Sequence, residues 1–246
     1  MIESIVDEFK NQLQENDPHL PLDKINRMYK IINSDNPNFI SYGLKMAEIE
    51  GVVRDLHKKF PCSYEDATDV FKELINSDIH EEKLFAVFFL NRFKKEFSEE
   101  TINLFYNEFF KYCDSWAICD STMIRIIGPF LGKKGNEELA LDTVENWSNS
   151  DDMWTKRASM VILLKIVMIR KKFDKEYVFD LVEKVNQSSE DYIQKGIGWL
   201  LKTCSRYDSD VIFKYLMENK TTLPRLILRY ASEKLTKEKR AEVLKK

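Results

Sequence analysis

A tryptophan and an aspartate stand four positions apart in the segment "CDSWAICDST", residues 113–122. If the segment is helical, Trp116 and Asp120 lie on one face about one turn apart. A carboxylate beside an indole face can stabilise positive charge that develops on a bound molecule. The alternative is that Trp116 packs in the core and Asp120 caps the helix that follows.

A second tryptophan has basic neighbours in "DDMWTKRASM", residues 151–160. Trp154 and Arg157 are three residues apart, which places them on one helix face with Lys156 alongside. These side chains could hold a polyanion. The alternative is a packed tryptophan with an arginine whose stem lies along it and whose charged end reaches solvent.

The segment "DYIQKGIGWLLK", residues 191–202, carries a basic and aromatic stripe of Lys195, Trp199 and Lys202. Gly196 and Gly198 lie within the same predicted helix, where each costs roughly 1 kcal/mol relative to alanine. The two glycines therefore predict that something approaches this helix closely. Both a neighbouring helix and a phosphate backbone fit.

Two arginines one turn apart, Arg225 and Arg229, begin the helix predicted in "LPRLILRYASEKL", residues 223–235. They form either a solvated basic face or a phosphate-binding pair. Aromatic and basic side chains on successive helices would together suit a charged polymer with flat faces.

Other kinds of site have little support. The three histidines and four cysteines occur in unrelated segments without metal-ligand spacing, and there is no glycine-rich phosphate loop. We therefore predict no metal site, no disulfide framework, and no nucleotide or other cofactor.

The composition is that of a folded, charged globular protein. Hydrophobic residues make up 43% and charged residues 32% of the 246 residues, and the formal net charge is −3. A nucleic-acid site would therefore need basic residues gathered on one face. The N-terminal segment "MIESIVDEFK" lacks the pattern of a signal peptide, and no apolar run is long enough to cross a membrane. We predict a cytoplasmic protein.

Apolar residues recur at intervals of three and four, and glycine and proline are scarce, so the pattern predicts an all-α fold. The expected helical stripes cover 20–32, 49–60, 67–75, 84–93, 102–110, 118–131, 139–147, 154–168, 177–185, 192–204, 211–217 and 226–235.

Helix pairs recur at roughly 35 to 40 residues from Ile79 onward, the scale of HEAT-like repeats. This spacing predicts one continuous helical-repeat solenoid with a concave and a convex face. The break "KKGNEE", residues 133–138, is too short for a linker, so we expect a single domain over residues 1–246.

Five ordered segments resemble the AlkD-like DNA alkylation repair family of HEAT-like DNA glycosylases. They are "HEEKLFAVFFL", "SWAICDS", "WTKRASMVILL", "IQKGIGWLLK" and "PRLILRYASEKL". Ala117 stands where the family often has an acidic residue, and Met46-Ala47 where Thr-Pro or Ser-Pro is common. The Met46-Ala47 departure bears on the polar contacts that some family members make to DNA near Leu44.

The resemblance implies that Asp120 is the catalytic carboxylate, with Trp116 and Trp199 as aromatic walls beside the lesion nucleotide. It also implies that the solenoid is right-handed, that its concave face binds DNA, and that Arg157 contacts the DNA. We expect further DNA contacts from Trp154, Lys156, Lys195, Lys202, Arg225 and Arg229.

The leading hypothesis is therefore a monomeric DNA glycosylase that removes cationic alkylated purines from double-stranded DNA. Two alternatives stay open: a non-catalytic helical-repeat protein that binds distorted or branched DNA, and a protein-binding scaffold.

Overall fold

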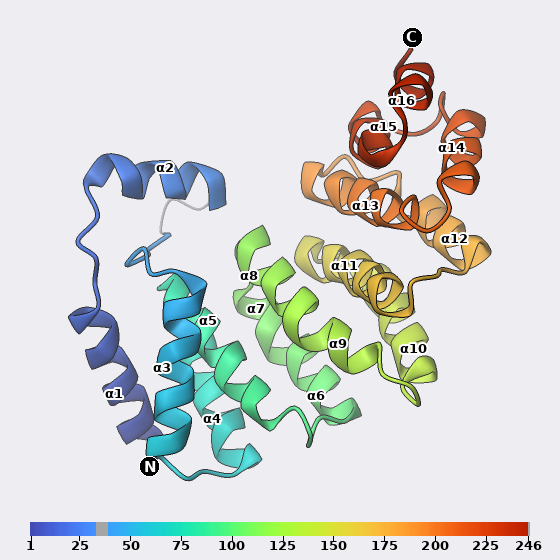
Figure 1. The fold of residues 1–246 in the computed structure, drawn as a ribbon. Helices are drawn as coiled ribbons and strands as arrows, with labels where there is room; N and C mark the ends of the chain where they lie inside the picture. Colours follow the sequence, from blue (N-terminus) through green and yellow to red (C-terminus); the bar gives the residue numbers. More distant parts are fainter. Residues whose placement is uncertain (33–38, 246) are drawn as a thin grey trace. The chain divides into compact units, whose positions relative to one another are not determined.

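The computed structural model describes residues 1–32 and 39–245 (Figure 1). Within these residues the chain is helical apart from its connections, and Ile40 and Ile79 form an isolated parallel bridge. The all-α prediction is confirmed. One predicted break, "NSDNPN" at 33–38, lies outside the described residues.

The helices form two compact units, residues 1–122 and 123–246, which we call the N-terminal and C-terminal units. The division falls inside the helical run from Trp116 to Leu131, not at "KKGNEE". The single domain over residues 1–246 remains a prediction.

The N-terminal unit packs around α5, whose residues are all buried. Phe85 of α5 stacks on Phe9 of α1, with ring centroids 3.7 Å apart. The helices of this unit are α1 (Ile2–Glu15), α2 (Leu22–Ile32), α3 (Met46–Lys59), α4 (Tyr64–Ile75), α5 (His80–Leu90), η1 (Asn91–Phe93), α6 (Glu99–Leu104), η2 (Phe105–Phe109), α7 (Phe110–Tyr112) and α8 (Trp116–Thr122).

A buried carboxylate holds the connection that precedes α3. Glu81 accepts hydrogen bonds from the Ser41 hydroxyl at 2.7 Å and from the backbone N–H groups of Tyr42, Gly43 and Leu44 at 3.1, 2.9 and 3.2 Å. Gly43 has a φ of +83°, a conformation that glycine adopts without strain. The first turn of α5 therefore fixes residues 41–44.

The C-terminal unit stacks its helices in two layers. Helices α11, α13 and α15 pack against one another in one layer, and α10, α12, α14 and α16 form the other. Its helices are η3 (Met123–Ile127), α9 (Gly128–Leu131), α10 (Glu137–Ser148), α11 (Met153–Arg170), α12 (Lys175–Val185), α13 (Asp191–Cys204), α14 (Ser209–Glu218), α15 (Arg225–Ala231), η4 (Ser232–Lys234) and α16 (Lys237–Leu244).

This layering is the helical-repeat organisation that the sequence spacing predicts. The helices of the first layer begin at Met153, Asp191 and Arg225, so one helix pair occupies roughly 35 residues. Each of the twelve predicted apolar stripes coincides with a helix or a run of consecutive helices, although residues 20–21, 60 and 235 lie just outside them. The right-handed twist and the concave face stay predictions.

Candidate functional site

Asp120 lies inside a helix and is not a cap. Ser115 precedes α8, and its hydroxyl accepts from the Ile118 N–H at 3.4 Å. The helical run then continues past Asp120 through the wider π-helical turn η3 into α9 without a break. The alternative in which Asp120 caps a following helix is therefore wrong.

The Asp120 side chain is 8% exposed, and Trp116, one turn earlier in α8, is half-buried. The Trp116 Nε1–H donates to the backbone carbonyl of Ile31, 3.0 Å away in the last turn of α2. The pair thus combines a carboxylate in a poorly solvated position with an indole whose edge is fixed. A charge in such surroundings acts more strongly than one in water.

Lys83 positions the start of α8. Its Nζ donates to the Tyr112 carbonyl at 2.8 Å and to the Asp114 carboxylate at 2.9 Å, and the Lys83 side chain is itself buried. These contacts tie the turn before Trp116 to α5. The sequence showed "HEEK" as part of a resembling segment but did not indicate that Lys83 reaches this turn.

In the C-terminal unit, Trp154 and Arg157 meet at Tyr192. The rings of Trp154 and Tyr192 have centroids 5.0 Å apart, and the Arg157 guanidinium donates to the Tyr192 carbonyl. Arg157 is 5% exposed, and its hydrogen bond to Tyr192 joins α11 to α13. Its predicted contact with DNA stays a prediction. Tyr192 was not among the predicted site residues.

The two glycines of α13 mark close approaches. A Cβ on Gly198 would stand 2.4 Å from the Cβ of Tyr230 in α15, and one on Gly196 would stand 3.1 Å from Met160 Cε. The same Cβ on Gly196 would lie in van der Waals contact with the Arg157 Nη1, at 3.5 Å. Of the two partners that the sequence left open, neighbouring helices account for these glycines.

The predicted stripe on α13 is half-buried and engaged within the protein. Lys195 pairs with Asp191 at 3.3 Å, and Lys202 pairs with Glu233 at 2.9 Å. Trp199 lies between these lysines on the same face. The two lysine side chains are therefore held by ion pairs within the protein.

The remaining predicted DNA-contacting cations differ in whether they have a partner within the protein. Arg225 donates to the Leu244 carbonyl, which ties α15 to α16. Lys156 and Arg229 make no ion pair with any residue that the structure describes. Of the predicted DNA-contacting residues, these two cations therefore have no ion pair with a described residue to break before they bind phosphate groups.

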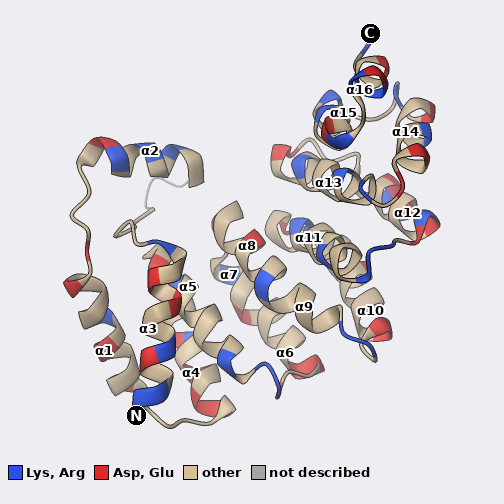
Figure 2. Ribbon diagram, viewed as in Figure 1, with Lys and Arg blue, Asp and Glu red and all other residues tan. Residues whose placement is uncertain are grey.

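Charge is segregated between the two layers of the C-terminal unit (Figure 2). The layer of α11, α13 and α15, which we call the basic layer, has Asp191 as its one acidic residue against Lys156, Arg157, Lys165, Arg170, Lys195, Lys202, Arg225 and Arg229. In the other layer, α10, α12 and α14 form what we call the acidic layer. Its acidic residues Glu137, Glu138, Asp142, Glu145, Glu176, Asp180, Glu183, Asp210 and Glu218 outnumber Lys175, Lys184 and Lys214. The fourth helix of that layer, α16, has mixed charge and is not included.

A chain with a net charge of −3 needs a local gathering of basic residues to attract a polyanion, and the basic layer is one such gathering. Trp154 and Trp199 lie in the basic layer, whereas Trp147, in α10, is buried.

Within the described residues, no group of three or more His, Cys, Asp or Glu side chains could hold a metal ion. None of the described helices is long and apolar enough to span a membrane.

No curated protein matches the chain. A solved structure described as a predicted DNA alkylation repair enzyme from Enterococcus faecalis is similar, with a TM-score of 0.72 and 18% sequence identity, over 87% of this chain and 94% of that chain. At this identity the likeness shows the fold. The family model for the DNA alkylation repair enzyme matches residues 12–235, nearly the whole chain. The chain therefore belongs to the DNA alkylation repair enzyme family.

Proposed function

We propose that the protein is a DNA glycosylase that hydrolyses the N-glycosidic bond of cationic alkylated purines, N3-methyladenine and N7-methylguanine, in duplex DNA. The observation that carries the proposal is the placement of Asp120, a carboxylate 8% exposed, one turn after an anchored tryptophan. Membership of the DNA alkylation repair enzyme family supports a DNA substrate.

The chemistry needs only one carboxylate. Alkylation at N3 or N7 already gives the purine a positive charge, so the base leaves as a neutral molecule without a general acid. The electrons of the N-glycosidic bond go to the base, and positive charge develops on the deoxyribose. Water adds to the sugar C1′ and loses a proton. Asp120 would stabilise the sugar cation and orient the water.

The tryptophans would favour the same transition state. An indole face attracts positive charge, an effect of about 0.5 to 2 kcal/mol. In this proposal Trp116 and Trp199 pack against the sugar, and the base stays stacked or nearly so rather than entering a deep pocket. The hydrogen bond from Trp116 to Ile31 would hold one of these faces in a fixed orientation.

DNA binding would rest on the basic layer. Lys156 and Arg229 would contact phosphates directly, and Trp154, Arg157, Lys195, Lys202 and Arg225 would add to the same surface. Phosphate contacts carry affinity with little dependence on sequence. The protein would thus bind duplex DNA broadly and act where a purine is already cationic.

The test is release of base from methylated duplex DNA. We expect the protein to release N3-methyladenine and N7-methylguanine from such DNA and to leave unmodified purines in place. Binding of the duplex without release of either base would instead favour the non-catalytic DNA-binding alternative, because the basic layer alone suffices for binding. Absence of both binding and release would reject both.

A further inference from the structure

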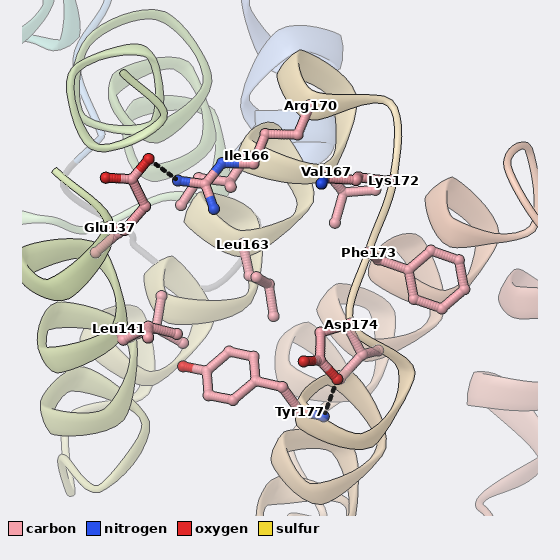
Figure 3. Close-up of a pocket in the computed structure, with 13 residues that line it drawn as sticks. Glu137, Leu141, Leu163, Ile166, Val167, Arg170, Lys172, Phe173, Asp174 and Tyr177 are labelled. Carbon is pink, nitrogen blue, oxygen red and sulfur yellow. Dashed lines mark hydrogen bonds and ion pairs between the residues drawn. The ribbon is translucent and has the colours of Figure 1, made fainter. Parts of the chain in front are cut away.

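The C-terminal unit contains a cavity of about 600 Å³ that none of the proposed DNA-contacting residues lines (Figure 3). It lies between α10, the C-terminal half of α11 and the start of α12. Most of its wall is apolar, including Leu141, Val144, Leu163, Ile166, Val167 and Phe173. Small-molecule sites typically have about 300 to 1,000 Å³ and mainly apolar walls with a few polar groups. The cavity has the size and lining of such a site.

The charged residues of the wall balance one another. Glu137 and Arg170 approach to 3.8 Å, and the Asp174 carboxylate accepts from the Tyr177 N–H at 3.1 Å as the cap of α12 (Figure 3). Lys172 is the other cation of the wall. With two acidic and two basic side chains, the wall offers no net charge to complement a strongly charged ligand.

One polar group of the wall has no partner. The Tyr177 hydroxyl oxygen is buried and makes no hydrogen bond with any described residue. In Figure 3 the ring extends so that this hydroxyl lies toward Leu141. Burial, together with the negative charges of Glu145 and Asp142, raises the pKa of Tyr177 to about 12. A tyrosine hydroxyl is protonated near neutral pH even at its ordinary pKa, so this one can donate its proton in a hydrogen bond.

We propose that this cavity binds a neutral, largely apolar small molecule whose carbonyl or ether oxygen accepts a hydrogen bond from Tyr177. A buried polar group without a partner is unfavourable, and a ligand oxygen at this position supplies the partner. The balanced wall charges exclude a strong preference for an anion or a cation. The proposal does not rest on the glycosylase activity, because no cavity residue takes part in that chemistry.

Benzophenone is a suitable probe, because it is neutral and apolar, carries one carbonyl, and cross-links to nearby C–H bonds on illumination. Diphenylmethane has the same two rings without the oxygen, and benzoylbenzoate adds a negative charge. We expect the full chain to bind benzophenone at one site, roughly 3- to 10-fold more tightly than diphenylmethane and more tightly than benzoylbenzoate. Cross-linked peptides identified by mass spectrometry should come from 137–178.

Three variants separate a ligand role of Tyr177 from a structural one. Tyr177→Phe should remove the preference for benzophenone over diphenylmethane. Tyr215→Phe is the matched control, because the Tyr215 hydroxyl is also buried without a described partner but lies outside the cavity wall. It should leave the preference unchanged. Leu141→Trp, at a wall position that is 50% exposed, should weaken both ligands without unfolding the protein.

The proposal is overturned if wild type fails to bind benzophenone up to its solubility limit, or if cross-links map outside 137–178. It is also overturned if Tyr177→Phe, folded by circular dichroism, keeps the full preference for the ketone. DNA binding and base release by the same preparations report separately on the proposed glycosylase function.

Discussion

The Trp116 indole N–H donates to the Ile31 carbonyl at 3.0 Å, which joins α8 to the last turn of α2. This contact spans 85 residues of sequence and sets the orientation of the ring one turn before Asp120. A phenylalanine at position 116 would keep a flat apolar face but lose the donor.

We expect Trp116→Phe to slow base release by a few-fold and Trp116→Ala to slow it by roughly 2- to 30-fold, the range that a cation–π contribution implies. Single-turnover release from methylated duplex DNA measures both. DNA affinity, measured in parallel, should change less than the rate. Full activity in Trp116→Ala would exclude this tryptophan from the reaction.

Affinity for DNA should fall steeply as salt concentration rises, because phosphate binding releases counterions. Arg229→Ala should reduce the slope of log affinity against log salt by about one, since Arg229 is exposed and makes no ion pair with a described residue. Lys214→Ala is the control, because Lys214 belongs to the acidic layer and pairs with Glu218 at 3.8 Å. Fluorescence anisotropy at several salt concentrations gives the slopes, and a flat response in wild type would rule out the basic-layer proposal.

Gly198→Ala should destabilise the fold by about 1 to 3 kcal/mol, because the new methyl group would stand 2.4 Å from the Tyr230 Cβ. Gly51→Ala, within α3, is the uncrowded counterpart. There the new methyl group would have the end of the Arg54 side chain as its nearest neighbour, at 3.8 Å. We expect Gly51→Ala to stabilise by up to about 1 kcal/mol. Urea unfolding of both variants checks the pair, and equal effects would contradict the tight contact between α13 and α15.

Stability should also depend on the protonation of His80. Burial lowers the pKa of His80 below its ordinary value of 6.5, although the negative charges of Glu81 and Asp114 act in the opposite direction and Lys83 adds to the lowering. The unfolded chain therefore binds a proton at position 80 more readily than the folded chain. The free energy of unfolding should fall as pH drops below 6.5, by at most about 1.4 kcal/mol per pH unit from this group.

Urea unfolding of wild type and His80→Gln between about pH 7.5 and pH 5.5 tests this dependence. His80→Gln should show a shallower fall in stability than wild type, whatever its absolute stability. Parallel curves for wild type and His80→Gln would show that His80 does not contribute.

The helices could be predicted because apolar spacing follows directly from which face of each helix is buried. The same pattern in "IESIVDEFKNQL" buries Ile5, Val6, Phe9 and Leu13 of α1, but we considered that segment only as a possible signal peptide. The short α16 is charged along most of its length, with Val243 as its buried residue, so it gave no comparable signal.

The site was less predictable, because its contacts join residues far apart in the sequence. Trp116 and Ile31, or Gly198 and Tyr230, meet only through tertiary packing. The basic layer likewise emerges only when alternate helices are known to stack together. The pairing of Lys202 with Glu233 depends on the approach of α13 to η4.

The most direct test of the central proposal is the single-turnover rate at which wild type and Asp120→Asn release N3-methyladenine and N7-methylguanine from methylated duplex DNA. Asparagine keeps the size of the side chain and removes its negative charge. The proposal predicts release by wild type. The rate in Asp120→Asn should be lower by a factor of roughly 10² or more, and the DNA affinity should be nearly unchanged. Equal release by both proteins would contradict the role of Asp120, and no release by a wild type that binds the duplex would contradict the glycosylase itself.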